Sequence, residues 1–175
     1  MLTRNYWQFF ASMMGRLNGS SQSLTLTLPD GTTLTDAVFG SASKPYTLLG
    51  AICAPFSNEN YGKSYGTWYG KGRTPATMED YKLEEPITDG SLTIAGGKNT
   101  YTTTINGDHV RIAAAHLVTN NTSEDIAVSE IGSFGCFTSA GKPIMMDHTV
   151  LETPVIIPAR DTSTIEYVIK FPLGT

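Results

Sequence analysis

The clearest hydrophobic pattern in the chain is an alternation near its C-terminal end, over residues 163–171. Apolar side chains occupy one face and polar side chains the other: Ile165, Tyr167, Ile169 and Phe171 against Thr164, Glu166 and Lys170. Only Val168 breaks the pattern. Successive side chains of a strand point to opposite faces, so this period of two predicts a half-buried antiparallel β-strand.

Shorter runs of the same kind fill the chain from residue 109 onward. Turn sequences separate them, namely Asn106-Gly107-Asp108 and Asn120-Asn121-Thr122-Ser123. Residues 110–118 and 126–132 are predicted as strands, and residues 145–151 and 155–157 as two further strands before the closing one.

The first half of the chain adds hairpin signals. Asp30-Gly31 lies between an alternating Leu/Thr run and residues 32–35, a strong signal for a tight β-turn. Gly96-Gly97-Lys98-Asn99 predicts a second hairpin between residues 91–94 and 102–105. About ten short strands with turns between them predict an all-β fold, an antiparallel β-sandwich of jelly-roll or immunoglobulin-like type over residues 19–175.

Residues 2–17 differ from the rest because their apolar positions recur with helical spacing. The stripe consists of Tyr6, Trp7, Phe9, Phe10, Met13, Met14 and Leu17. It predicts a short N-terminal amphipathic helix over residues 1–18, ended by Asn18-Gly19. The stripe packs either on its own domain or, as an assembly arm and protein interface, on another chain; the aromatic and Met content favours the second interpretation.

Composition narrows the function classes. Charged residues make up only 16% of the chain, the formal net charge is −4, and the twelve basic residues are scattered. Nucleic acid is therefore excluded as a predicted partner, because phosphate binding needs a concentrated basic face. No apolar run reaches about 18 residues, so no membrane insertion is predicted. Cys53 and Cys136 lie in apolar surroundings and are interpreted as buried free thiols.

Four polar residues lie nearest the predicted core: His116, Glu130, Asp147 and His148. A buried carboxylate needs a partner, and we expect Glu130 to pair with His116, Arg111 or a nearby backbone N–H in a structural polar network. The same four residues could form a metal or acid–base site, but their spacing matches no such motif. We predict no catalytic residue, no cofactor and no metal.

Aromatic residues interleaved with glycine mark the stretch before residue 70. Tyr61, Tyr65, Trp68 and Tyr69 form a predicted surface aromatic patch, which would suit stacking on sugar rings. The alternative function is therefore a carbohydrate-binding module that recognises a host-surface glycan. The following Gly70-Lys71-Gly72 does not complete a phosphate-binding loop, because Tyr65 replaces its first glycine.

Three pieces of the chain, spread over residues 66–171, resemble a known group of proteins. The first runs from Trp68-Tyr69-Gly70-Lys71-Gly72 to Asp80-Tyr81-Lys82-Leu83, and the second from Leu117-Val118-Thr119-Asn120-Asn121-Thr122 to Glu130-Ile131-Gly132. The third combines residues 145–151 with Val155-Ile156-Ile157-Pro158-Ala159 and the closing strand. Together they are similar to small β-sandwich virion structural proteins of tailed bacteriophages, of the tail, collar and fibre-associated kind. Ser133 stands where that group often has an apolar residue.

The resemblance implies a non-enzymatic virion structural protein of the tail or collar. Such a protein acts as a homo-oligomer, binds copies of itself and other virion proteins, and is assembled in the bacterial cytoplasm into the virion. A capsid decoration protein or head fibre component is the alternative within the same class.

Overall fold

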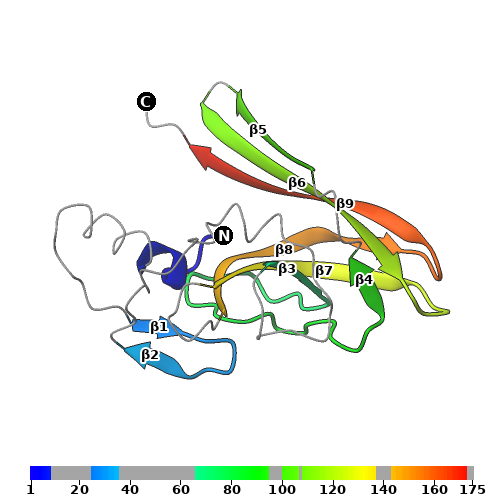
Figure 1. Cartoon of the computed structure of the whole chain (residues 1–175), viewed down its shortest axis with the longest axis horizontal. Helices are drawn as coiled ribbons and strands as arrows, with labels where there is room; N and C mark the ends of the chain where they lie inside the picture. The colour runs from blue at the N-terminus through cyan, green and yellow to red at the C-terminus, as the bar shows by residue number, and fades with distance from the viewer. Residues whose placement is uncertain (9–24, 36–65, 95–99, 107, 137–142, 173–175) are drawn as a thin grey trace.

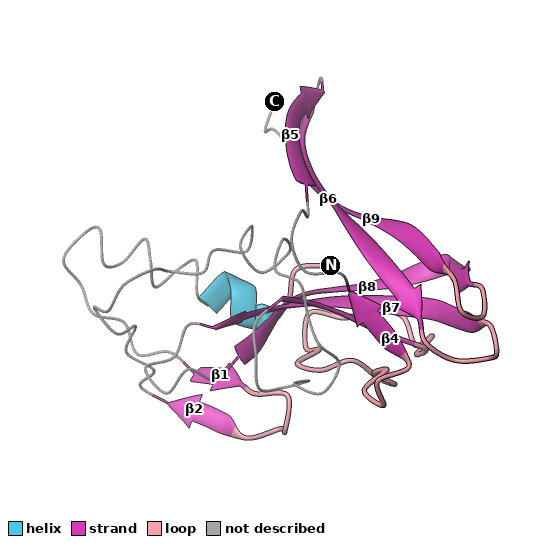
Figure 2. Ribbon diagram, turned by 45° about the vertical axis from the view of Figure 1, so that its right-hand side comes forward, coloured by secondary structure: helices cyan, strands magenta, loops and turns pink. Residues whose placement is uncertain are grey.

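The structure is a computed structural model that describes residues 1–8, 25–35, 66–94, 100–106, 108–136 and 143–172. About 60% of these residues are in strands and about 5% in helix, and the sheets are antiparallel. The predicted all-β, sandwich-like fold with one short N-terminal helix is confirmed, and the helix spans residues 4–8 of the described part (Figure 2).

The described residues form two larger sheets and one small hairpin (Figure 1). The first sheet has the order β3 (Gly66–Gly70), β7 (Ile126–Cys136), β8 (Pro143–Ile157). In the second sheet, β6 (His109–Asn120) pairs with β9 (Thr162–Pro172) along one edge and with β4 (Leu92–Ile94) and β5 (Thr100–Asn106) along the other. The hairpin pairs β1 (Thr25–Thr27) with β2 (Thr33–Thr35) around Asp30-Gly31, as predicted.

The strands β4 and β5 do not pair with each other, so the hairpin predicted between residues 91–94 and 102–105 is wrong. Both β4 and β5 pair antiparallel with β6, with Ile94 opposite Val118 and Thr100 opposite Ala115. The two strands therefore run in the same direction along one edge of β6. Turn residues allow a chain to reverse, but here the long neighbouring strand offers a partner to both segments.

The strand β8 is longer than predicted, because residues 145–151 and 155–157 belong to one strand. Between Val128 and Glu130 of β7, the partner residue on β8 changes from Val155 to Val150. This irregularity accommodates Pro154, which lacks an N–H for the ladder, without ending the strand.

A two-stranded ribbon connects the two sheets. The pair β6–β9 continues into the pair β7–β8, and the chain crosses between sheets at residues 121–125 and 158–161. Asn120 is fully buried at this corner, and its amide group donates to the carbonyls of Glu124 (2.7 Å) and Ile157 (3.0 Å). Its side-chain oxygen accepts from the backbone and hydroxyl groups of Thr122, both at 2.8 Å. The corner is thus fixed by one fully satisfied amide.

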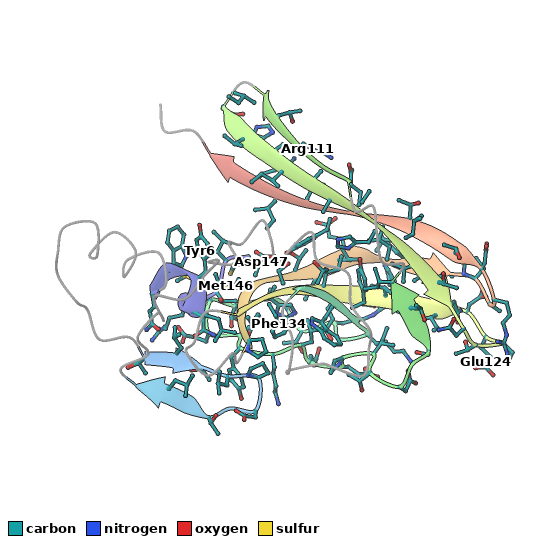
Figure 3. The ribbon with its side chains drawn as sticks, in the orientation of Figure 1. Tyr6, Arg111, Glu124, Phe134, Met146 and Asp147 are labelled. Carbon is teal, nitrogen blue, oxygen red and sulfur yellow. The ribbon has the colours of Figure 1, made fainter. Side chains whose placement is uncertain are left out.

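Apolar side chains are buried on both faces of the first sheet. Phe134 (Figure 3) lies on the same face as Gly132 and Leu83, because a Cβ on Gly132 would meet both the Leu83 and the Phe134 side chains. Ile165, Tyr167 and Ile169 of β9 are buried while Thr164, Glu166 and Lys170 are exposed, so the predicted alternation of this strand is confirmed. The largest fully buried side chains from the two sheets and the loops around them are Trp68, Leu83, Leu92, Ile131, Phe134, Ile144, Met145, Met146 and Ile157.

The first residues of the chain pack on their own domain. Leu2 forms a bridge with Asp147, where Thr3 N–H donates to the Met146 carbonyl (3.0 Å) and His148 N–H donates to the Met1 carbonyl (2.9 Å). Residues 1–3 therefore extend the first sheet at the edge of β8. Met146 and Asp147 lie beside the helix that carries Tyr6 (Figure 3).

Asn5 ties the same segment to the small hairpin. Its side chain donates to the Thr27 carbonyl (2.8 Å) and accepts from the Thr27 N–H (3.0 Å). Tyr6 packs against the core, whereas Trp7 is 48% exposed. Residues 1–5 therefore find hydrogen-bond partners on β8 and β1 of their own domain, and packing of the predicted stripe on another chain stays a prediction. Phe9, Phe10, Met13, Met14 and Leu17 lie outside the described residues.

Candidate functional site

Glu130 is the most deeply buried carboxylate in the described part of the chain, with no exposed surface. It lies on the central strand β7, opposite Gly70 of β3. Its Oε1 accepts from the backbone N–H groups of Gly72 (3.1 Å) and Glu85 (2.7 Å), and its Oε2 accepts from the N–H of Glu84 (3.0 Å). The predicted burial and the predicted pairing with backbone N–H groups are confirmed.

Glycine makes this approach of backbone to carboxylate geometrically feasible. A Cβ on Gly70 would lie 2.3 Å from Glu130 Oε1, and one on Gly72 would lie 2.7 Å from the same atom. Both distances are far inside van der Waals contact. The glycines of Trp68-Tyr69-Gly70-Lys71-Gly72 therefore make room for a carboxylate of the protein itself.

His148 completes the arrangement from the neighbouring strand β8. Its Nε2 lies 3.1 Å from Glu130 Oε2, and its Nδ1 lies 2.6 Å from Asp80 Oδ2. Two carboxylates around one ring require a donor on each nitrogen, which only the protonated imidazolium supplies. We call Glu130, His148 and Asp80 the Glu130 cluster.

The charges in the Glu130 cluster stabilise each other. Burial alone would lower the pKa of His148, but hydrogen bonds to Glu130 and Asp80 outweigh it and raise this pKa. Burial alone would raise the pKa of Glu130, but the bonds from His148 and from three backbone N–H groups outweigh it and lower the pKa. Burial alone would also raise the pKa of Asp80, but hydrogen bonds from Thr77 and His148 outweigh it and lower this pKa.

The Glu130 cluster holds the long segment after β3 against the first sheet. Asp80 accepts from the N–H (2.8 Å) and hydroxyl (2.7 Å) of Thr77, which closes a turn within that segment. Glu84 accepts from the backbone N–H groups of Arg73 (2.8 Å) and Thr74 (2.9 Å). Carboxylates thus replace the ladder hydrogen bonds that residues 71–85 lack.

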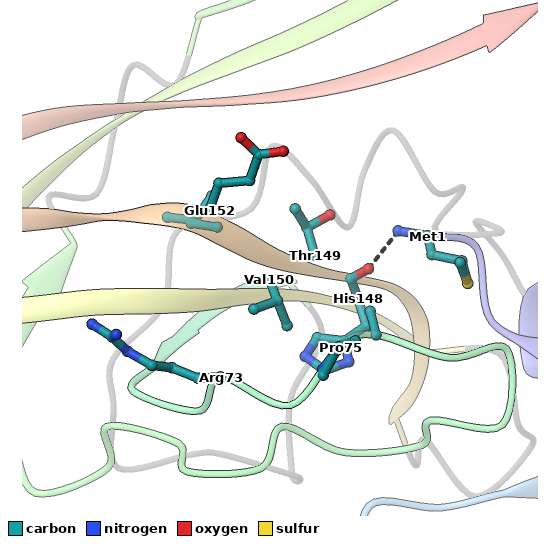
Figure 4. A pocket seen from close by; sticks show the side chains of 9 residues that line it. Met1, Arg73, Pro75, His148, Thr149, Val150 and Glu152 are labelled. Atoms are coloured by element: carbon teal, nitrogen blue, oxygen red, sulfur yellow. Dashed lines mark hydrogen bonds between the residues drawn. The ribbon is translucent and has the colours of Figure 1, made fainter.

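Two cavities border His148. One, of about 500 Å³, is lined by Met1, Arg73, Pro75, Ala76, His148, Thr149, Val150, Leu151 and Glu152 (Figure 4). The other, of about 210 Å³, lies on the side of Asp80 and Tyr81. The imidazolium has both N–H groups occupied and is only 3% exposed, so it offers neither cavity a free acid or base.

The other predicted members of the network have different partners. Arg111 pairs with Glu166 (2.8 Å) across the exposed face of β6 and β9, and His116 Nδ1 lies 2.6 Å from the Tyr69 hydroxyl. The prediction that either residue pairs with Glu130 is therefore wrong. Strand register explains the difference: Arg111 lies opposite Lys170 in the second sheet, whereas Glu130 belongs to the first.

Asp147 belongs to a second buried group. It accepts hydrogen bonds from the hydroxyls of Tyr167 and Thr149, and the Met1 amino group lies 3.0 Å from its Oδ1. Burial and then the Asp147 charge raise the pKa of Tyr167. Glu130 and Asp147 thus have separate sets of partners.

The predicted aromatic patch is not a surface where the structure describes it. Trp68 is 1% exposed and Tyr69 is 3% exposed, and every residue of β3 is buried. The first sheet is covered on both faces at this strand, so no sugar can stack on these two rings. Tyr61 and Tyr65 lie outside the described residues.

Within the described residues, no group of three or more His, Cys, Asp or Glu side chains could hold a metal ion. No helix there is long and apolar enough to cross a membrane. Comparison of the chain with protein-family models, with curated proteins and with solved structures gave no match.

Proposed function

We propose that the chain is a bacteriophage virion structural protein of the tail or collar, which acts by binding copies of itself and neighbouring virion proteins. The observation that carries the proposal is the free end of the second sheet, where β5, β6 and β9 project away from the first sheet (Figures 1 and 2). Ile105 on this projection is 76% exposed. It lies opposite Val110 of β6, on the face that is buried further along that strand.

An apolar row that continues beyond its own core is typical of a protein contact. The polar groups of the interior support the same interpretation. The oxygens and nitrogens of Glu130 and His148 are occupied by hydrogen bonds that hold the fold together. The carbohydrate-binding alternative loses two of its four aromatic residues to the core, because Trp68 and Tyr69 are buried.

The test is the composition of particles. Virions of the phage that encodes the chain, purified on a density gradient, should contain it in a fixed copy number. Antibody labelling should place it at the tail or collar, and labelling of the capsid surface would instead support a decoration protein or head fibre. Purified, infectious particles without the chain would refute the proposal.

A further inference from the structure

The sheet edges of this protein differ in how they are protected against pairing with another chain. Unpaired N–H and C=O groups at an edge are a template for a further strand, and proteins block them with charges, proline, bulges or covering segments. In the first sheet, residues 1–3 cover part of β8. Along β3, Ile87 N–H donates to the Tyr69 carbonyl (3.0 Å), so residues 85–87 cover that edge.

Other edges are blocked by side chains or by shortness. The edge strand β9 carries Glu166, Lys170 and Pro172. Asn5 occupies the backbone groups of Thr27 on β1, and its hairpin partner β2 is only 3 residues long.

In the described part of the chain, the edge of β5 carries none of these devices. Its 7 residues, Thr-Tyr-Thr-Thr-Thr-Ile-Asn, include no charge and no proline. The pairing with β6 is continuous from Thr100 opposite Ala115 to Asn106 opposite His109, so no bulge interrupts it. Its β-branched and aromatic residues favour strand structure. Thr104 and Ile105 near its end are exposed, which shows that this part of the strand is not covered.

We propose that β5 pairs with β5 of a second copy of this chain, antiparallel and about a two-fold axis, so that the second sheets of two molecules become one. This inference rests on the proposed function and specifies the surface through which copies of the chain bind each other. A strand without charge meets its own copy with no like charges opposed. The row of Ile105 and Val110 would then continue into the partner and be covered there.

The test compares the full-length protein with matched lysine variants by sedimentation velocity over a range of concentrations. Wild type should show a concentration-dependent dimer. I105K should weaken the dimer at least tenfold, because each molecule then carries a charge in the strand edge that has to pair. I156K is the control, since Ile156 on β8 is also exposed (51%) but lies in the first sheet.

Hydrogen exchange of wild type gives a readout that needs no variant. Amides of β5 should be protected at high concentration and should lose protection on dilution, while those of β7 should not change. A wild type that stays monomeric, a dimer unaffected by I105K, or β5 exchange independent of concentration would each overturn the pairing. Particles that contain a protein failing these tests would leave the proposed function standing and the β5 contact refuted.

Discussion

The Glu130 cluster allows one stability measurement to be worked out in advance, that of the variant E130Q. Glutamine keeps the size of the side chain but replaces one carboxylate oxygen by an NH₂ group. Each oxygen of Glu130 faces two donors: Gly72 and Glu85 on Oε1, Glu84 and His148 on Oε2. Whichever way the amide is turned, two buried donors therefore lose their acceptor.

A buried donor without a partner costs about 1–3 kcal/mol, and breaking a buried charge pair costs about 3–5 kcal/mol. We therefore expect E130Q to lower the free energy of unfolding by roughly 2–5 kcal/mol near pH 6. The cost should fall at higher pH. A neutral His148 can accept a hydrogen bond from the amide while its other nitrogen donates to Asp80, which restores one lost contact.

Urea denaturation at pH 6 and pH 8.5 measures both effects, with equal slopes required for the comparison. The matched control is E166Q, which removes the charge from the exposed pair with Arg111 and should cost less than about 1 kcal/mol. Equal midpoints for E130Q and E166Q at pH 6 would show that the four contacts of Glu130 contribute nothing specific to stability.

Three further predictions follow from the same structure. The raised pKa of His148 stabilises the folded protein at pH values below 6.5, the usual pKa of histidine, and this stability is lost as the pH rises through the raised pKa. The lowered pKa of Glu130 stabilises the folded protein at pH values above 4.5, and this stability is lost on acidification. Denaturation at pH 3–9 should thus show a maximum between about 4.5 and 6.5. N120A should lose roughly 2–4 kcal/mol in a urea titration, because four corner hydrogen bonds disappear, whereas N121A at the exposed neighbouring site should lose less. G70A should unfold at a much lower temperature than G90A, because a Cβ at Gly70 would meet the Glu130 side chain and the Glu85 carbonyl. A Cβ at Gly90 would meet nothing within 4 Å, so G90A should lose only the about 1 kcal/mol that a positive φ costs an alanine.

The features that sequence predicts correctly here are local ones. The alternation in β9 and the Asp30-Gly31 turn each depend on residues a few positions apart, and their geometry follows from backbone sterics and burial. The segment at residues 95–99 shows the limit of this reasoning. Its glycines permit a reversal, but the direction of β5 depends on β6, a strand that follows later in the chain.

The partners of Glu130 could be predicted only in part. Its burial follows from its place among apolar residues of β7, and backbone N–H groups were one of the expected partners. His148 and Asp80, however, lie 68 residues apart in sequence, and no spacing rule connects them. The irregularity in β8 that brings His148 opposite Gly132 depends on pairing across the whole sheet.

The loop at residues 71–87 explains both why the predicted aromatic patch is buried and why Glu130 has the partners that it has. Residues 71–87 cover the outer face of the first sheet, and Leu83, only 1% exposed, packs so close to Gly132 that a Cβ there would lie 2.8 Å from its Cδ2. Trp68 looks like a surface ring in the sequence because nothing local indicates that a later loop will cover it.

Some of the segments on which the proposed resemblance rests lie next to one another in the structure. Residues 68–72, 80–83 and 130–132 contact one another through the Glu130 cluster and the packing of Leu83. Those residues are occupied by internal contacts, so they can specify the fold without specifying a partner. In the proposed assembly, the choice of partner then depends on surfaces outside these three segments. Among the sheet edges that the structure describes, β5 combines 7 uncharged residues with exposed Thr104 and Ile105, and it lies on the projecting end of the second sheet. Changes at β5 should therefore alter assembly while the fold is retained, and changes in the Glu130 cluster should alter the fold first.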